Sequence, residues 1–161
     1  MGKGTERYAL IYVFFALTVF ILDLTTKNLA ELYLKEKDFS PFPFLHFTLV
    51  YNRGVAFGFL SEAPDLIRLP LLLLTPLLAL VITFLYAMKA GKYTLAVLMG
   101  MVGGGAMGNF YDRVALGHVR DFIYLSYGWL SWPAFNLADA SISTAIGLFL
   151  LLGLFGKSGK G

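Results

Sequence analysis

The chain contains no cysteine, which excludes disulfide bonds, thiol nucleophiles and thiolate metal sites. Histidine is almost as scarce, because His46 and His118 are the only two imidazole side chains in 161 residues. A transition-metal centre is built mainly from such nitrogen and sulfur ligands. We therefore expect neither a metal site nor a cofactor.

Charged residues are also few. They make up 14% of the chain, against 58% for hydrophobic residues, whereas soluble proteins have about a quarter of their residues charged. This composition is typical of an integral membrane protein. The formal net charge of +3 reflects basic residues beside the apolar segments and gives no indication of nucleic-acid binding.

Charged residues separate four apolar stretches at 8–22, 69–88, 93–111 and 140–156. A membrane span needs about 20 residues, so the first and last stretches are too short unless polar residues join them. Asp23 and Lys27 would extend the first helix, and Asn136 and Asp139 the fourth. We therefore expect a single membrane domain over residues 1–161, with helices at about 8–28, 67–88, 93–112 and 134–156.

Basic residues in the short segments predict how the chain lies in the membrane. They precede the first helix, fill the link between helices two and three, and follow helix four, at Lys3, Arg7, Lys89, Lys92, Lys157 and Lys160. The positive-inside rule then places both termini in the cytoplasm and the segments 28–67 and 113–133 outside. The N-terminal stretch lacks a small-residue cleavage site, so we interpret it as a retained span rather than a signal peptide.

The first outward segment predicts local β-structure. Residues 42–51 are aromatic and β-branched, and Asn52-Arg53-Gly54 is a turn signal that leads into the apolar run 55–60. The expected fold is therefore an all-α integral membrane protein, a four-helix transmembrane bundle with a small β-rich lobe at about 38–62 on the outer leaflet. In the second outward segment, the aromatic residues suit the lipid–water interface: Tyr124, Tyr127, Trp129 and Trp132.

The third helix carries glycines at a spacing of four, at positions 100, 104 and 108, which lets a neighbouring helix approach closely. Asn109, Asp112 and Arg113 follow on one helical face. We interpret Asp112 beside Arg113 as a structural ion pair.

Two further acids are candidates for chemistry. Asp121 precedes an apolar aromatic run that would desolvate its carboxylate and raise its pKa, and Asp139 follows Asn136 by three residues in a helix expected to begin near Pro133. Either acid alone also suits a helix N-terminus for dipole reasons. Together they can share one proton, as the carboxylates of aspartic proteases do, and hydrolyse a peptide bond without a covalent intermediate. A serine nucleophile is a weaker option, because no serine has an evident histidine or lysine partner.

Five segments, at residues 23–27, 52–58, 104–113, 119–123 and 135–139, occur in an order that resembles the signal peptidase II family. The resemblance implies an aspartic endopeptidase of the bacterial cytoplasmic (inner) membrane, with its active site towards the outer face. It would cut lipid-modified prolipoproteins before the diacylglyceryl-bearing cysteine, contact membrane lipids, and be blocked by globomycin-like inhibitors. The implied catalytic pair is Asp121 and Asp139. The matching supporting or substrate-binding positions are Asp23, Lys27, Asn52, Gly54, Asn109, Asp112, Arg113, Asn136 and Ala138. Arg120 is given no role.

Elementary chemistry gives these supporting residues plausible tasks. Asp23 and Lys27 are four residues apart and can pair, while Asn109, Arg113 and Asn136 supply donors that can orient carboxylates or hold substrate carbonyls. Two other functions stay open from the residues alone: a small proton-coupled transporter that uses the interfacial acids, and a non-catalytic assembly scaffold. A transporter would favour an acid near the midplane between symmetric repeats, and the two halves of this chain show no repeat.

Overall fold

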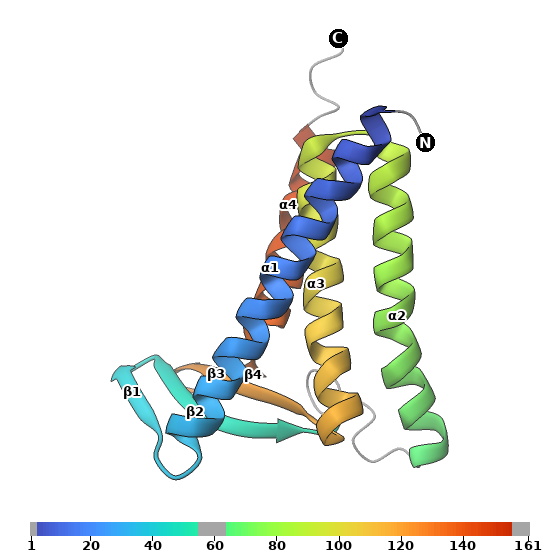
Figure 1. Ribbon diagram of the computed structural model, residues 1–161. Helices are drawn as coiled ribbons and strands as arrows, with labels where there is room; N and C mark the ends of the chain where they lie inside the picture. Colours follow the sequence, from blue (N-terminus) through green and yellow to red (C-terminus); the bar gives the residue numbers. More distant parts are fainter. Residues whose placement is uncertain (1–2, 55–63, 156–161) are drawn as a thin grey trace.

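The computed structural model describes residues 3–54 and 64–155, which form helices joined to one antiparallel sheet (Figure 1). In chain order the elements are α1 (Lys3–Leu34), β1 (Phe39–Phe42), β2 (Leu45–Asn52), α2 (Asp65–Ala90), α3 (Tyr93–Leu116), β3 (Val119–Tyr127), β4 (Leu130–Phe135) and α4 (Leu137–Phe155). The sheet lies across one end of the helices, whereas α1 begins and α4 ends at the opposite end. The fold is therefore helical with a terminal sheet, and not all-α.

Three of the described helices are long and apolar enough to cross a membrane: Gly4–Leu34, Asp65–Ala90 and Leu137–Leu154. The four-span expectation is thus not confirmed, because α3 does not reach the same apolarity. Its sequence includes several glycines together with Asn109 and Asp112, and many of its residues are buried. A helix enclosed by its neighbours has less need of a lipid-facing apolar surface.

Close helix packing follows from the glycines of α3. A Cβ atom at Gly104 would lie 2.3 Å from the backbone oxygen of Ala16 in α1, and one at Gly100 would lie 2.6 Å from that of Tyr12. On another face, a Cβ at Gly105 would lie 2.7 Å from the backbone oxygen of Ala138 in α4. The predicted small-residue ridge is confirmed on the side of α1, which it lets approach α3 at backbone contact, and Gly105, outside that ridge, does the same for α4.

The sheet has the order β1-β2-β3-β4, so half of it comes from the second outward segment. The expected lobe at 38–62 accounted for only the first half. Within the pairing of β2 with β3, Val50 lies opposite Asp121 and Asn52 lies opposite Val119. This register places Asn52 at the edge of the bundle, beside the first residues of β3.

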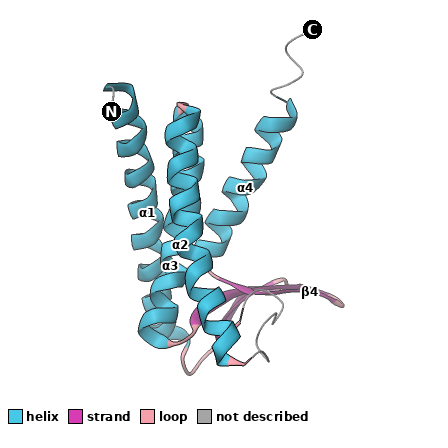
Figure 2. Cartoon of the chain, turned by 90° about the vertical axis from the view of Figure 1, so that its right-hand side faces the viewer, coloured by secondary structure: helices cyan, strands magenta, loops and turns pink. Residues whose placement is uncertain are grey.

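Several helix boundaries differ from the expected ones. Helix α1 continues to Leu34, well past the expected end at residue 28, and α4 begins at Leu137 rather than at 134. Pro133 lies inside β4, at the edge of the sheet, where the missing N–H of proline leaves no ladder bond unmade. Figure 2 shows α4 diverging from α1 and α3 as it leaves the sheet.

Candidate functional site

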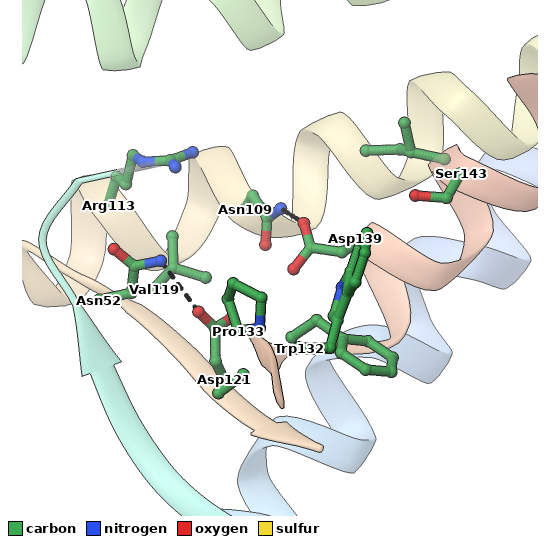
Figure 3. A pocket seen from close by; sticks show the side chains of 12 residues that line it. Asn52, Asn109, Arg113, Val119, Asp121, Trp132, Pro133, Asp139 and Ser143 are labelled. Atoms are coloured by element: carbon green, nitrogen blue, oxygen red, sulfur yellow. Dashed lines mark hydrogen bonds between the residues drawn. The ribbon is translucent and has the colours of Figure 1, made fainter. Parts of the chain in front are cut away.

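A cavity of about 330 Å³ lies where the sheet meets α3 and α4 (Figure 3). Residues of β2, α3, β3, β4 and α4 line it: Asn52, Asn109, Arg113, Val119, Asp121, Trp132, Pro133, Ala134, Phe135, Asp139, Ile142 and Ser143. Both candidate acids are among these residues. The cavity therefore gathers side chains that are far apart in the sequence around two carboxylates.

Asp121 is held at the inner end of β3 and is only 2% exposed. Asn52 donates to its Oδ2 at 3.0 Å, and Asn136 donates to its Oδ1 at 2.7 Å. The Asn52 amide is itself fixed, because its Oδ1 accepts the backbone N–H of Gly54 at 2.9 Å in an Asx turn. Asn52 consequently presents its NH₂ group to the carboxylate.

Burial raises the pKa of Asp121 to about 7. The hydrogen bond from Asn52 acts in the opposite direction, and the negative charge of Asp139 adds to the increase. A buried carboxyl with this pKa carries its proton for much of the time at neutral pH. Asp121 can therefore donate a hydrogen bond.

Asp139 occupies the first turn of α4 and forms a capping box with Asn136. The backbone N–H of Asp139 donates to Oδ1 of Asn136 at 3.0 Å, and the backbone N–H of Asn136 donates to Oδ2 of Asp139 at 3.3 Å. The other carboxylate oxygen accepts Nδ2 of Asn109 at 2.8 Å. The helix-terminus role and the candidate chemical role thus fall on the same side chain.

Two asparagines connect the carboxylates. Nδ2 of Asn136, which donates to Asp121, also donates to Oδ1 of Asn109 at 3.1 Å, and Asn109 in turn donates to Asp139. The contacts among the described residues thus join the acids through amides rather than through a direct hydrogen bond. This arrangement gives the two acids different surroundings and fixes both orientations.

Behind the cavity lies a group of fully buried charges: Asp23, Lys27 and Asp112 are all 0% exposed. Nζ of Lys27 lies 2.7 Å from Asp23 and 3.6 Å from Asp112, and it donates to Oδ1 of Asn109 at 2.9 Å. That last bond fixes the Asn109 amide so that its NH₂ group faces Asp139. Asp23 also accepts the backbone N–H of Ala138, at the start of α4, at 2.9 Å.

The expected pairing of Asp112 with Arg113 is wrong. Asp112 instead binds Arg120, whose Nη2 lies 2.8 Å from its Oδ1, and it approaches Lys27. Adjacent residues of a helix do not face each other, which is why the neighbouring guanidinium turns elsewhere. Nη2 of Arg113 donates to the backbone oxygen of Gly54 at 3.3 Å, and its Nε is buried without a hydrogen-bond partner among the described residues.

The structure gathers every implied supporting residue at this end of the bundle, and it adds Arg120, Asn28 and Trp132, which sequence reasoning missed. Arg120 was detectable, because a charged residue in the apolar run of β3 needs a buried partner. The apolar run 55–60, expected to follow the turn after Asn52, lies outside the described residues. Within residues 3–54 and 64–155, which the structure describes, no cluster of three or more potential metal ligands occurs.

Comparison with known proteins gives one consistent result. The family model described as Signal peptidase (SPase) II matches residues 15–155. The chain is 58% identical over 157 residues to the lipoprotein signal peptidase of Aquifex aeolicus (strain VF5), covering 98% of this chain and 93% of that protein. It is 44% identical over 156 residues to the protein of the same name from Sulfurihydrogenibium sp. (strain YO3AOP1), covering 94% and 96%.

A solved structure described as a bacterial membrane enzyme superposes with a TM-score of 0.81 at 30% identity, covering 93% of this chain and 91% of that one. These matches cover nearly the whole chain. The chain belongs to the signal peptidase II family.

Proposed function

We propose that this chain is an aspartic endopeptidase that removes the signal peptide from lipoprotein precursors, cutting before a diacylglyceryl-modified cysteine. The observation that carries the proposal is the pair of carboxylates, Asp121 and Asp139, in one cavity with unlike surroundings. The names of the matched relatives support the substrate class. The transporter alternative finds no support in these comparisons.

The surroundings of the two acids assign them different tasks. Asp121, whose pKa is raised to about 7 by burial, donates its proton to the carbonyl oxygen of the scissile peptide. Asp139 accepts two hydrogen bonds from amides and receives the proton of the attacking water. The resulting tetrahedral gem-diol collapses by breaking the C–N bond: the proton taken up by Asp139 passes to the leaving amine, and one hydroxyl of the gem-diol returns a proton to Asp121 as the new carbonyl forms.

Other cavity residues position the substrate. The buried Nε of Arg113, which lacks a partner among the described residues, is available to a backbone carbonyl of the substrate. Asn52 and Asn136 keep Asp121 in place during the reaction. Gly54 is buried beside Asn52, so an extended peptide meets backbone there rather than a side chain.

A second cavity of about 320 Å³ adjoins the first and shares Asn109, Arg113 and Ile142 with it. Its remaining lining comes from apolar or hydroxyl-bearing side chains of α2, α3 and α4: Leu71, Leu72, Thr75, Pro76, Ala79, Val102, Ala106 and Ile146. An apolar segment of a signal peptide or an acyl chain suits such a surface. Substrate then reaches the carboxylates from within the bilayer.

We place the protein in the bacterial inner membrane as a single four-span domain, with α3 as the enclosed fourth span. Both termini lie in the cytoplasm and the sheet lies on the outer face. Lys89 and Lys92, which link α2 to α3 at the end away from the sheet, support this orientation. Contact with membrane lipids follows from the exposed apolar side chains of the spans.

The decisive experiment incubates the purified protein in detergent with a diacylglyceryl-modified precursor peptide and, separately, with the same peptide unmodified. We expect mass analysis to show one cut, immediately before the modified cysteine, and no cut in the unmodified peptide. Globomycin-like peptides should block the reaction, and chelators should not. Absence of cleavage, or a cut at another bond, would overturn the proposal.

A further inference from the structure

Arg120 is held by Asp112 through both its backbone and its side chain. The backbone N–H donates to Oδ2 of Asp112 at 3.0 Å, Nε donates to the same oxygen at 3.2 Å, and Nη2 donates to Oδ1 at 2.8 Å. Arg120 is 6% exposed and Asp112 is fully buried. A planar guanidinium is suited to this forked contact, and a lysine ammonium is not.

The remaining groups of Arg120 reach two other helices. Nη1 donates to Oδ1 of Asn28 in α1 at 2.8 Å. Its backbone oxygen accepts Nδ2 of Asn136 at 3.4 Å, and the same nitrogen donates to Asp121 at 2.7 Å. The residue that precedes Asp121 is therefore tied to α3, to α1 and to the residue that caps α4.

Arg120 also balances the buried charges. Asp23 and Asp112 are opposed by Lys27 and Arg120, and Arg120 is the cation closer to Asp112, at 2.8 Å against 3.6 Å for Lys27. Without Arg120, the unpaired Asp112 carboxylate would attract Lys27 more strongly. Lys27 would then move away from Asn109, whose amide it orients towards Asp139.

We propose that Arg120 is a positioning residue for the proposed hydrolysis. It holds the start of β3, and with it Asp121, against α1 and α3, and it keeps Lys27 in place to orient Asn109 towards Asp139. Arg120 is not among the described residues that line the cavity. Its removal should therefore slow the chemical step while leaving substrate binding nearly unchanged.

The test rests on the proposed function and begins with wild-type cleavage of the diacylglyceryl-modified peptide. Arg120→Lys keeps the charge but loses the fork, so we expect kcat to fall by about tenfold to a hundredfold, with KM within about twofold of wild type. The melting temperature should change little, because the buried positive charge is retained. Arg7→Lys, at an exposed arginine on the far end of α1, is the matched control and should leave kcat unchanged.

Asn28→Ala provides a milder variant that should fold in any case, because Asn28 is exposed at the surface of α1. It removes the Nη1 contact only, and we expect kcat to fall by about twofold to fivefold, because Asn28 is exposed and acts on Asp121 only through Arg120. The exposed neighbour Thr25→Ala is its control. If Arg120→Lys does not fold, the Asn28→Ala result decides the question.

The outcomes separate the two proposals. Failure of wild-type protein to cleave the modified peptide would overturn the proposed function. Cleavage by wild type with unchanged kcat in the folded Arg120→Lys and Asn28→Ala variants would overturn the positioning role alone. A rise in KM at constant kcat would also overturn it, because Arg120 would then act on binding.

Discussion

Helices α1 and α3 pack against each other at both ends of the bundle, but by different means. At the end away from the sheet, the ring of Tyr8 packs against that of Tyr93, tilted by 50°, at 5.0 Å between ring centroids, and the hydroxyl of Tyr12 hydrogen-bonds Thr83 of α2 at 2.9 Å. At the sheet end, the same two helices meet through the buried charges of Asp23, Lys27 and Asp112.

The two kinds of contact serve different purposes: the aromatic contacts stabilise the bundle, and the buried charges position side chains. Apolar and aromatic contacts tolerate small displacements, whereas buried ions are costly unless their geometry is maintained. An intact buried ion pair adds little net stability over an apolar contact of the same size, although removing one of its partners is costly. The buried charges at the sheet end are therefore best understood as devices that fix Asn109, Ala138 and the start of β3 around the cavity.

The largest expected effect is on the proposed catalytic pair. Asp121→Asn and Asp139→Asn should each lower kcat by about a thousandfold or more, because an amide preserves shape but cannot exchange the required proton. Cleavage of the modified peptide and circular dichroism would be measured together. Asp38→Asn, at an exposed acid on the outward side, is the control. Substantial turnover in either variant would remove that acid from the mechanism.

The next effect contrasts the two ends of the bundle directly. Lys27→Met leaves Asp23 and Asp112 without their shared lysine and should lower the free energy of unfolding by about 3–5 kcal/mol. Tyr12→Phe removes one buried hydroxyl at the opposite end and should cost about 1 kcal/mol. Unfolding in detergent would measure both. Equal losses would contradict the distinction between the ends.

A smaller effect is expected in the glycine ridge. Gly104→Ala places a Cβ 2.3 Å from the backbone of Ala16, so α1 must move, at a cost of about 1–3 kcal/mol. Gly147→Ala, where no atom lies within 4 Å of the added Cβ, should be neutral or slightly stabilising. The melting temperatures of the two variants would test this contrast. A tolerant Gly104 would mean that α1 and α3 are less closely fitted than described.

The smallest effect concerns pH. Because the pKa of Asp121 in the folded state is raised to about 7 from a usual 3.8, its contribution favours folding below about pH 4 and is lost as pH rises through 7. The stability of the wild type should therefore fall between pH 4 and pH 8, and Asp121→Asn, which has no titrating group at this position, should lack that part of the loss. Wild-type kcat/KM should decline above about pH 7. Identical stability curves for the two proteins would contradict the raised pKa.

The sequence carried enough information for the helices, the glycine ridge and the acids, because each depends on local spacing. Gly100, Gly104 and Gly108 share a helical face whatever surrounds them. Asn136 and Asp139 are three residues apart, a spacing that places them on the same side of a helix. Apolar stretches bounded by charges likewise indicate helices without tertiary information.

The parts that escaped prediction depend on pairing between distant segments. Strands β3 and β4 were missed because their aromatic residues also suit a membrane interface, and only pairing with β2 decides between the two. The Asp112–Arg120 contact was missed because the chain reverses between them at Gly117, whose φ of 77° ends α3. Pairing Asp112 with its sequence neighbour Arg113 therefore overlooked Arg120, which lies beyond that turn.

The capping box of Asn136 and Asp139 has a consequence for how the protein is made. The same hydrogen bonds that begin α4 also complete the cavity, and α4 follows α1 to α3 and the sheet in chain order, so the ribosome makes it after them. A nascent chain that carries α1 to α3 and the sheet holds Asp121 but not its partner acid. The proposed catalytic pair is then complete once α4 docks against Asn109 and Asp23, so we expect a chain that stops before α4 to lack peptidase activity.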